Sequence, residues 1–366
     1  MYLKEISLLN YKNIAETQLE FSPKVNCIVG SNGEGKTNLI DAIYYLSFCR
    51  SAINPNDSQV IRHDCDFMML QGKYLPFGHG DSETIYCGLK KQQKKVFKRN
   101  GKEYQRLSEH IGHIRLVMVS PQDTDLILGG SEIRRKFMDM VISQYQVEYL
   151  HQEIRYRKAL QQRNALLRAL TEPDEAFISI YEEEMAQAGE YVSNQRRTFL
   201  QEFLPIFSQI YQQLAGKDEG ADLKYVSQTD RGSLLTQIQE SRPKDRIMGF
   251  SLCGTHRDDL NMLLHDFPIK REGSQGQNKT FVIALKLAQF VFLKNKGKSH
   301  LPILLFDDIF DKLDTQRVEQ IVKMVGEDDF GQIFITHTNK DFLKGVLKEN
   351  TDYIFHVNNG VITRSI

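Results

Sequence analysis

Residues 24–37 read KVNCIVGSNGEGKT and combine a strand-like run with a glycine-rich loop. The first six residues are mostly apolar, as in a short buried strand. The spacing Gly30-x-x-x-x-Gly35-Lys36-Thr37 then fits the phosphate-binding P-loop. Apolar residues at helical spacing follow at once, so the order is strand, Gly-rich turn, helix, which is the context that this motif requires. A Gly-rich turn that binds nothing is the alternative, and the flanking strand and helix argue against it.

The P-loop would bind phosphate mainly through its backbone. Glycines let the chain fold round an anion with its N–H groups pointing inward, and the following helix N-terminus adds a partial positive charge. Lys36 would bridge the outer phosphates, and the Thr37 hydroxyl would hold Mg²⁺. Phosphate binding alone leaves kinases, transporter ATPases, GTPases and DNA-repair ATPases open. The expected nucleotide contacts are Gly30, Ser31, Asn32, Gly33, Glu34, Gly35, Lys36, Thr37 and Asn38.

Size and composition set broad limits on the function. A chain of 366 residues is long enough for two domains and a large core. Its 47 basic residues balance 47 acidic ones, so any surface for nucleic acid must be local. The five cysteines form no CxxC pair, which favours reduced thiols in a cytoplasmic protein over a zinc site or disulfides. The sequence also shows no apolar run of membrane-spanning length and no signal-peptide core, so we expect no membrane.

Strand-like patterns dominate the first third of the chain. Residues 1–30 read as strands, and the region from about 65 to 120 is again rich in strand patterns. Within it, Asn100-Gly101 is a strong signal for a hairpin turn. The apolar run at 113–121 is a further strand. We therefore expect a β-rich subdomain over about 65–120.

A helical insertion follows. No Gly or Pro occurs over 131–171, and apolar side chains recur there at helical spacing, which predicts one helix or two nearly continuous ones. A second helical run covers about 174–215. The pair is expected to form a short antiparallel helical arm over 131–247. An ordinary all-α subdomain fits the same pattern.

The α/β pattern resumes after about residue 248. The stretch 251–264 is strand-like, 279–294 is an amphipathic helix, and 353–366 is expected to be a closing hairpin. We therefore expect residues 1–130 and 248–366 to form one α/β domain that the helical arm splits in sequence.

A second motif places two aspartates at the end of an apolar, strand-like run. In PILLFDDIFDKLD, residues 302–314, four apolar residues precede Asp307 and Asp308. In P-loop ATPases such a strand lies beside the P-loop strand, and we expect the same here. Asp307 would meet the Mg²⁺ shell because a hard cation takes oxygen ligands, and Asp308 would orient or deprotonate the attacking water. The alternative is a pair of acids that caps a strand end.

Two further stretches are candidates for phosphate contact. Ser274 opens the turn SQGQ at the start of the 279–294 helix, where a hydroxyl and an amide-rich turn would bind an anion. Alone, such a serine is usually an N-cap. Its place about 30 residues before the acidic strand makes it more specific. His337, at the end of QIFITH, would hydrogen-bond a γ-phosphate or serve a structural role, and both remain open.

Together these motifs carry a family resemblance. GSNGEGKTNLIDAIYYLS, SQGQNKT, LLFDDIFDKLD and ITH resemble the Walker A, signature, Walker B with D-loop, and switch motifs of ABC-type ATPases. SPQDTDLILGGSEIRRKFMD and CGTHRDDL resemble the RecF family of recombination-repair proteins, and this resemblance spans essentially the whole chain. It implies an α/β ABC-type ATPase head like that of SMC proteins, a short helical arm, and an ATP-dependent homodimer on double-stranded and gapped DNA. It also implies partners RecR and RecO, loading of RecA recombinase, and work in DNA repair, replication and the SOS response.

The resemblance also implies roles for single residues. Gln122 follows the 113–121 strand, where such ATPases place a Q-loop glutamine, although Asp123 is equally near. Asp308 is an aspartate where most ABC-type ATPases have glutamate, and its shorter side chain leaves the water less well positioned, which implies slow hydrolysis. The resemblance further implies a weak, DNA-stimulated ATPase that acts as a conformational timer. The implied site residues are Asp308, Lys36 and His337 for catalysis, Thr37, Asp307 and Gln122 for Mg²⁺, and Ser274, Gly276, Gln277, Gln122 and Asp314 for ATP beside the P-loop.

A basic stretch is the candidate DNA contact. Residues 90–106, KKQQKKVFKRNGKEYQR, hold eight basic residues and one acid. Such a hairpin would follow phosphates without reading bases, or it is a solvated edge that uses lysine to prevent aggregation. Basic residues at 134–136 and 155–158 are further candidates. The hairpin residues expected to contact DNA are Lys94, Lys95, Lys98 and Arg99.

Other classes remain as alternatives. A transporter ATPase subunit would carry its signature motif much closer to the P-loop than the 238 residues that separate Lys36 from Ser274. A long-armed SMC-like protein would need far more heptad sequence or a CxxC zinc hook. A small-molecule kinase would not need the SQGQ turn.

Overall fold

The structure, a computed structural model, describes residues 1–78, 80–169, 174–297, 301–310, 315–325, 330–338 and 352–365. The chain forms two compact units. The first comprises Met1–Asp123 and Gln289–Ile366 and contains the P-loop and the acidic strand. The second comprises Thr124–Ala288 and contains the helical insertion.

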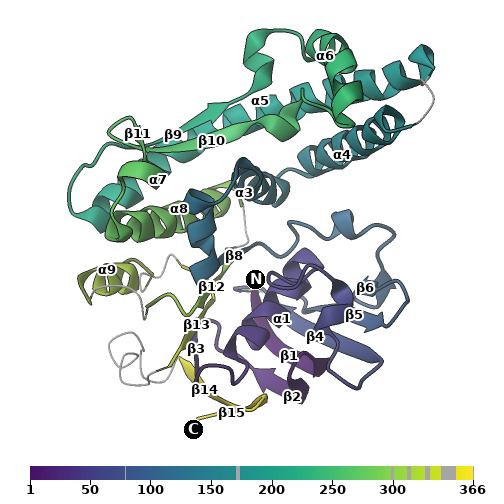
Figure 1. Cartoon of the computed structure of the whole chain (residues 1–366). Helices are drawn as coiled ribbons and strands as arrows, with labels where there is room; N and C mark the ends of the chain where they lie inside the picture. The colour runs from purple at the N-terminus through teal and green to yellow at the C-terminus, as the bar shows by residue number, and fades with distance from the viewer. Residues whose placement is uncertain are drawn as a thin grey trace. The chain divides into compact units, whose positions relative to one another are not determined.

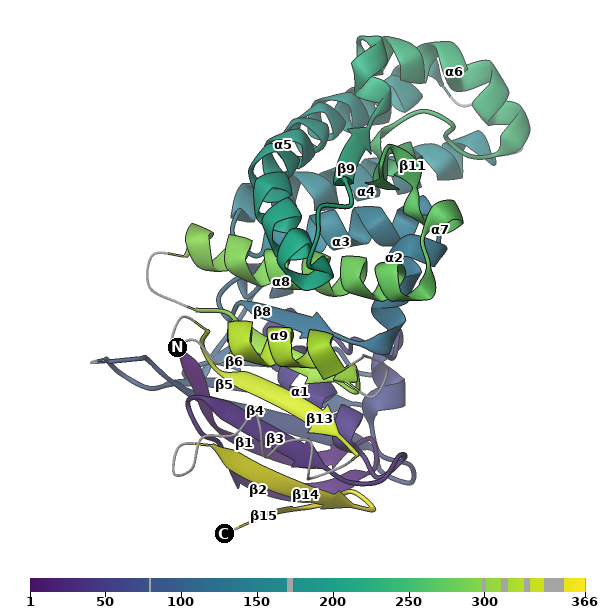
Figure 2. The same cartoon turned by 90° about the vertical axis from the view of Figure 1, so that its left-hand side faces the viewer.

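A six-stranded, mostly parallel sheet carries the P-loop in the first unit (Figures 1 and 2). Five of its strands are parallel, and only the edge strand β15 is antiparallel to its neighbour. Every residue of β12 and β13 is buried, as expected when both faces of a parallel sheet are covered. In sheet order the strands are β15 (Val361–Arg364), β14 (Tyr353–Asn358), β3 (Val25–Val29), β13 (Ile333–His337), β12 (Ile303–Asp307) and β8 (Leu116–Val119).

An antiparallel sheet forms the second layer of the same unit. The hairpin turn predicted at Asn100-Gly101 is confirmed, because both residues have positive φ angles of 50° and 78°. In sheet order the strands are β2 (Ile14–Glu20), β1 (Tyr2–Tyr11), β4 (Phe67–Leu75), β5 (Glu83–Lys90), β6 (Val96–Arg99) and β7 (Lys102–Glu103). Short helical turns and a helix complete the unit, namely η1 (Asp57–Val60), η2 (Leu107–Glu109), η3 (Pro121–Thr124) and α9 (Thr315–Val325).

Helix α1 (Lys36–Phe48) is the core of the first unit. It contacts β1, β4 and β5 of the antiparallel sheet and β8, β12 and β13 of the parallel sheet. Eleven of its 13 residues are buried, because both sheets cover it. The helix that follows the P-loop is therefore held on two sides, which fixes the start of the helix where phosphate would bind.

One expectation about the strands needs correction. The 113–121 strand was expected in the β-rich subdomain, but β8 pairs with β12 in the parallel sheet. Conversely, the N-terminal strand β1 pairs with β4 and so joins the antiparallel sheet. Pairing of this kind depends on partners distant in the sequence, which a local strand pattern does not identify.

The second unit is built on helices with a small sheet at one side. Three strands form its antiparallel sheet, β11 (Phe267–Pro268), β10 (Asp259–Leu264) and β9 (Ala221–Val226). Its helices are α2 (Asp125–Leu128), α3 (Ser131–Ser143), α4 (Val147–Leu167), α5 (Glu175–Ala215), α6 (Leu234–Met248) and α7 (Ile269–Glu272), with the turns η4 (Gln228–Arg231) and η5 (Thr255–Arg257). The division between the units falls within α8 (Gln275–Lys296).

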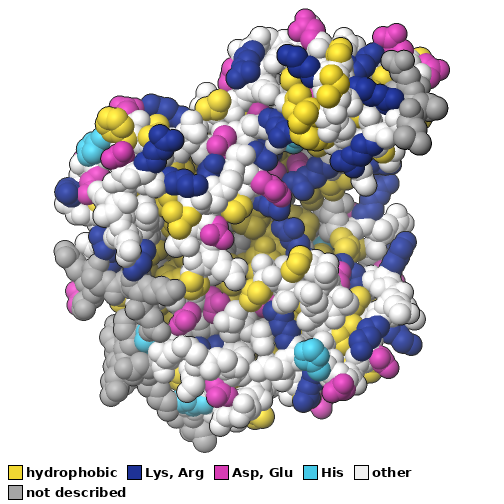
Figure 3. All heavy atoms as spheres, viewed as in Figure 1, with side chains coloured by type: hydrophobic (Ala, Val, Ile, Leu, Met, Phe, Trp, Pro, Cys, Tyr) yellow, Lys and Arg dark blue, Asp and Glu magenta, His cyan; other side chains and the backbone are white. Residues whose placement is uncertain are grey.

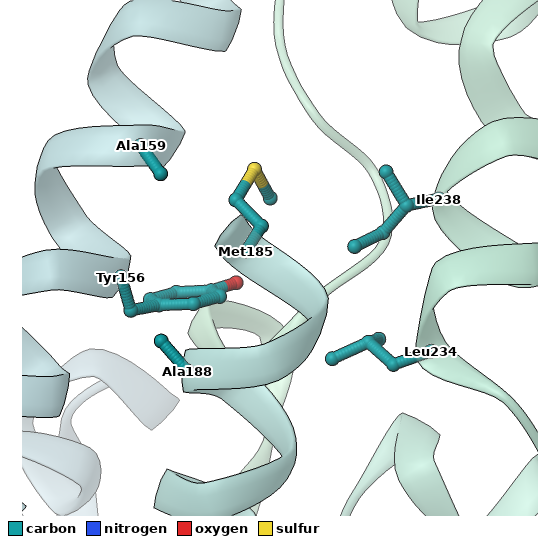
Figure 4. Close-up of a cluster of buried hydrophobic side chains, with 6 residues drawn as sticks. All are labelled: Tyr156, Ala159, Met185, Ala188, Leu234 and Ile238. Atoms are coloured by element: carbon teal, nitrogen blue, oxygen red, sulfur yellow. The ribbon is translucent and has the colours of Figure 1, made fainter. Parts of the chain in front are cut away.

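The helical insertion has the two long runs that the sequence predicts. The first is two helices rather than one, α3 and α4, and the second is the single helix α5, which ends at Gly216 in a left-handed conformation. Helices α4 and α5 run alongside each other (Figure 1). An apolar cluster joins α4, α5 and α6 (Figure 4), consisting of Tyr156, Ala159, Met185, Ala188, Leu234 and Ile238.

The compact second unit is larger than the arm expected over 131–247. It begins at Thr124 and extends to Ala288. The reason is strand pairing, because β9 lies within the expected arm and pairs along its whole length with β10, which lies beyond it. The stretch 251–264, expected to be one strand, forms the turn η5 followed by the shorter strand β10.

Candidate nucleotide-binding site

The P-loop follows β3 and needs glycine at three positions. Gly33 and Gly35 have φ angles of 87° and 114°, in the left-handed region that residues with a Cβ adopt only at a cost. At Gly30 a Cβ would lie 2.5 Å from the carbonyl oxygen of Val357 on β14. The spacing of glycines seen in the sequence is therefore a requirement of the backbone path and of packing against the neighbouring strand.

Groups from two distant turns support the loop. The Asn13 side chain, between β1 and β2, donates to the Glu34 carbonyl at 3.0 Å and accepts from the Asn38 side chain at 2.7 Å. The Gly360 N–H, between β14 and β15, donates to the same Glu34 carbonyl at 2.9 Å. A Cβ on Gly35 would lie 2.6 Å from the Asn13 amide nitrogen. Sequence reasoning missed Asn13, because a lone asparagine in a strand turn has an ordinary local explanation.

Lys36 is buried and reaches back over the loop. Its Nζ donates to the carbonyl oxygens of Gly30 at 2.7 Å and Ser31 at 2.9 Å. An ammonium group has three donors, so these two bonds leave one for a further acceptor. The lysine is thus positioned within the loop that would hold the phosphates.

Asp307 joins the P-loop helix to the acidic strand. Its Oδ1 accepts hydrogen bonds from the hydroxyls of Thr37 at 3.0 Å and Thr336 at 2.9 Å. Burial raises the pKa of the Asp307 carboxyl above its usual value, and these two hydrogen bonds act in the opposite direction. A buried carboxylate beside a hydroxyl is an oxygen donor set of the kind that Mg²⁺ takes.

Asp308 has an unusual backbone and an unpartnered oxygen. Its φ angle is 51°, and its N–H donates to the Thr336 hydroxyl at 2.8 Å. Within the described part of the chain, its Oδ1 is buried and has no hydrogen-bond partner. A buried polar atom without a partner costs free energy, so this oxygen is suited to accept from a bound water or ligand. Thr336, which contacts both aspartates, was not singled out from the sequence.

The strand order differs from the expected one. The acidic strand β12 does not lie beside the P-loop strand β3, because β13 pairs with both and lies between them. His337, the last residue of β13, is buried and is opposite Val29, the last residue before the P-loop. The inserted strand thus brings His337 and Thr336 between the P-loop and the aspartates, and Thr37 still contacts Asp307.

Gln122 and Asp123 have different surroundings. The Asp123 carboxylate accepts from the Ser120 N–H at 2.7 Å, so it caps its own turn. The neighbouring Gln122 side chain is exposed, just after β8. Of the two residues, Gln122 is therefore the one whose side chain remains available for a ligand. Asp314 lies outside the described residues.

Ser274 belongs to the second unit and is the N-cap of α8. Its hydroxyl accepts from the Gln277 N–H at 3.2 Å, and the Gln277 side chain accepts from the Ser274 N–H at 2.9 Å. This reciprocal pair is a capping box. Ser274 is exposed and Gly276 is partly exposed, so the start of α8 is accessible.

The four hairpin residues expected at DNA are not equivalent. Lys95 Nζ contacts the Asp57 carboxylate at 2.7 Å and the Cys49 carbonyl at 2.6 Å. Arg99 makes a two-pronged contact with the Glu83 carboxylate at 2.8 and 2.9 Å. These two cations are already neutralised within the fold. Lys94 is exposed, and Lys98 Nζ lies 6.0 Å from the centroid of the Tyr86 ring.

Among the described residues, none of the helices has the length and the apolar character that crossing a membrane requires. Nor do these residues contain a cluster of three or more histidine, cysteine, aspartate or glutamate side chains that would hold a metal ion.

Comparison with known proteins identifies the family. The RecF/RecN/SMC N terminal domain family matches residues 2–363. The "DNA replication and repair protein RecF" of Phocaeicola vulgatus is 59% identical over 365 residues, which are 99% of this chain and 98% of that protein. The protein of the same name from Bacteroides fragilis is 58% identical over 364 residues, with the same coverage of both chains.

Solved structures agree with the sequence relatives. The recombination mediator protein RecF–ATPrS of the RecFOR pathway has a TM-score of 0.90 and 29% identity, covering 100% of this chain and 98% of that one. An Smc head bound to the C-winged helix domain of ScpA has a TM-score of 0.58 at 18% identity over 100% and 97% of the two chains, which shows a shared fold. The α/β ABC-type fold predicted from the motifs is thereby confirmed. This chain belongs to the RecF family of ABC-type ATPases, whose head domain is shared with the SMC proteins.

Proposed function

We propose that this chain is an ATP-dependent DNA-binding protein of recombinational DNA repair and replication-fork maintenance. It dimerises on gapped or duplex DNA when ATP binds, works with RecO and RecR in the cytoplasm, and helps to load RecA recombinase. Slow, DNA-stimulated hydrolysis of ATP resets it. The observation that carries the proposal is the contact of Thr37 with Asp307, which joins Walker A to Walker B in a chain whose relatives are named RecF over nearly their whole length.

The chemistry follows from the residues at that contact. Thr37 and Asp307 would hold Mg²⁺, which would supply positive charge to the phosphate oxygens. Lys36 binds the outer phosphates. Asp308 orients the attacking water, and its buried, unpartnered Oδ1 supports this role. His337 lies between the P-loop strand and the aspartates, which supports contact with the γ-phosphate.

The other half of the site is proposed to come from a second subunit. The capped, exposed start of α8 with Ser274, Gly276 and Gln277 binds the γ-phosphate of ATP held by the partner subunit. Gln122, in the same subunit as the P-loop, would contribute to the Mg²⁺ site, and Asp314 is a further proposed contact of the nucleotide. Support comes from the exposure of Ser274 and from the helix start that it caps.

Light scattering with and without nucleotide tests the proposed function. ATP with Mg²⁺ should convert monomer to dimer, ADP should not, and gapped DNA should bind to the ATP-bound dimer. Ser274→Arg should abolish the dimer and leave nucleotide binding by the monomer intact, because the bulky cation blocks only the approach of the second subunit. Equal dimer fractions in ATP and ADP would contradict the proposal.

A further inference from the structure

The stretch CGTHRDDL, residues 253–260, forms a locked turn in the second unit. Gly254 has a φ angle of 137°, and a Cβ there would lie 2.2 Å from the Tyr156 hydroxyl. The Tyr156 ring is held in the cluster of α4, α5 and α6 (Figure 4). Its hydroxyl lies 2.6 Å from His256 Nδ1, and His256 Nε2 donates to the Ser251 carbonyl at 3.1 Å. The turn η5 therefore has one well-defined position against α4.

The two aspartates of this stretch form ion pairs with arginines of the second unit. Asp258 is buried and pairs with Arg196 at 3.4 Å. The Asp259 carboxylate accepts hydrogen bonds from Nε and Nη2 of Arg134 at 2.7 and 2.9 Å. The side chain of Arg257, in contrast, is exposed and has no carboxylate partner among the described residues. The locked turn thus holds its aspartates inward and leaves one guanidinium at the surface.

Arg257 lines a cleft of about 600 Å³ with two similar arginines. Each donates one N–H to a backbone carbonyl: Arg135 to Asp258 at 2.5 Å, Arg168 to Gly249 at 3.0 Å, and Arg257 to Ser251 at 3.0 Å. Within the described chain, none of the three forms an ion pair. A guanidinium has five donors, so each is oriented by the backbone and keeps donors for a ligand. Arginines of this unit that do pair with carboxylates are Arg134, Arg155, Arg157, Arg163, Arg196, Arg197 and Arg242.

The cleft has an excess of positive charge. Burial lowers the pKa of Arg135, as does the nearby charge of Arg196, while the carboxylates of Asp139, Asp258 and Asp259 act in the opposite direction. On the face shown in Figure 3, Lys and Arg side chains gather over α4. Six cations line the cleft, Arg135, Lys136, Arg157, Arg168, Arg196 and Arg257, against three carboxylates, Glu132, Asp139 and Glu153.

We propose that this cleft binds the phosphodiester backbone of a nucleic acid, with Arg135, Arg168 and Arg257 each contacting phosphate oxygens. The inference rests on the proposed function as a DNA-binding protein and names the surface that meets DNA. The planar guanidinium fork matches phosphate geometry. Only four of the 18 lining residues are hydrophobic, Tyr156, Leu160, Val192 and Phe250. Such a lining suits nucleic acid, whose binding surfaces are polar and basic, better than a protein partner that needs aromatic anchors.

The test compares two triple variants of the full chain. The first replaces Arg135, Arg168 and Arg257 by Gln. The control replaces three exposed cations of the same unit outside the cleft, Lys217, Arg231 and Lys244, by Gln, so both lose the same charge. Affinity for a fluorescein-labelled DNA duplex of mixed sequence is measured by anisotropy with ATP and Mg²⁺ over a range of salt concentrations. The cleft variant should bind on the order of tenfold more weakly and lose roughly 0.9 from the slope of log affinity against log salt per phosphate contact removed. The control should change far less.

Single variants keep the test decisive if the triple variant folds poorly. Arg257 is exposed, so Arg257→Gln should unfold at the wild-type temperature and dimerise with ATP normally, yet bind DNA more weakly. Arg257→Lys keeps the charge but not the planar guanidinium, so it should bind DNA more tightly than Arg257→Gln and more weakly than the wild type. Equal DNA affinity of the cleft and control variants would overturn the inference and leave the proposed function standing. So would normal DNA binding with loss of a protein partner, which would make the cleft a protein interface. A wild-type chain that binds no duplex in any nucleotide state would overturn both.

Discussion

Asp307 is buried at the end of β12 and carries a charge that burial disfavours. Its pKa in the folded state lies above its value in the unfolded chain. The folded state therefore binds the proton more tightly, and this group removes stability as pH rises from its ordinary pKa through the raised one. Above that window the ionised carboxylate destabilises the nucleotide-free fold. The residue is suited to a bound cation rather than to structural stability.

Asp307→Asn should therefore raise the unfolding temperature of the nucleotide-free chain at neutral pH. Asparagine keeps the oxygen that accepts from Thr37 and Thr336 and removes the charge. The gain should appear as a higher unfolding midpoint than that of the wild type, because the variant buries no charge at this position. The variant should also lose most of the stabilisation that Mg²⁺ with ATP gives the wild type, and it should not hydrolyse ATP.

Scanning calorimetry with and without Mg²⁺ and ATP checks this. Asp57→Asn is the control, since Asp57 pairs with Lys95 and its neutralisation should lower the midpoint. A lower midpoint for Asp307→Asn in the absence of nucleotide would show that the carboxylate is a stabilising group.

The hairpin of β6 and β7 shows how an element limits the roles of its residues. Its lysines and arginine look alike in the sequence, but the fold uses them differently. Lys95 is mostly buried, contacts Asp57 and the Cys49 carbonyl, and lies 5.3 Å from the centroid of the Tyr45 ring. Its neighbour Lys94 is exposed. Lys95 is thus part of the structure of the hairpin base, and Lys94 is free to serve a ligand.

Lys95→Ala should destabilise the chain by about 1–3 kcal/mol, because Asp57 loses its paired cation and keeps the Tyr45 hydroxyl, and the Cys49 carbonyl loses the Lys95 donor. Lys94→Ala should change stability by less than about 0.5 kcal/mol. If the hairpin follows DNA, Lys94→Ala with Lys98→Ala should reduce the salt slope of duplex binding by roughly 0.9 for each contact. Urea unfolding and salt titrations measure the two effects. Parallel salt dependences with equal affinity would mean that the hairpin is a solvated edge.

At the scale of the whole molecule, each unit contains a histidine whose pKa is lowered by desolvation, the buried His110 in the first unit and the partly buried His256 in the second. Burial lowers the pKa of His110 in the first unit and of His256 in the second to about 4. His110 is held between the Tyr104 hydroxyl at 3.0 Å and the Leu46 carbonyl at 2.7 Å. The unfolded chain takes up these protons near the ordinary pKa of 6.5, before the folded chain does. Stability is therefore full above about pH 6.5 and falls toward pH 4 in both units.

Acid should thus destabilise the chain before most carboxylates protonate. Each histidine contributes a loss on the order of 3 kcal/mol once the pH is below both of its pKa values. His110→Gln retains a donor and an acceptor without the titration, so its unfolding temperature should fall less steeply between pH 6.5 and 4. The charged neighbours of His110, namely Glu83, Arg99 and His113, remain in both proteins. Identical pH profiles for the variant and the wild type would contradict this assignment.

The sequence alone determined the features that depend on local backbone geometry. The P-loop glycines, the apolar run before Asp307, the Asn100-Gly101 turn and the long helical runs all follow from spacing within a few residues. These patterns also carried the resemblance to the RecF family, because a motif such as SQGQ is recognised by its own residues and by its distance from the others.

Which distant groups meet depends on long-range packing, which the sequence patterns do not show. Thr37 and Asp307 are 270 residues apart, and the strand between them, β13, supplies Thr336. The support of the P-loop by Asn13, the pairing of Lys95 with Asp57, and the gathering of three arginines with no carboxylate partner in one cleft arise in the same way. The local sequence around each of these residues does not mark it for its role. That role comes from long-range packing, which brings together charges and donors that no local pattern connects.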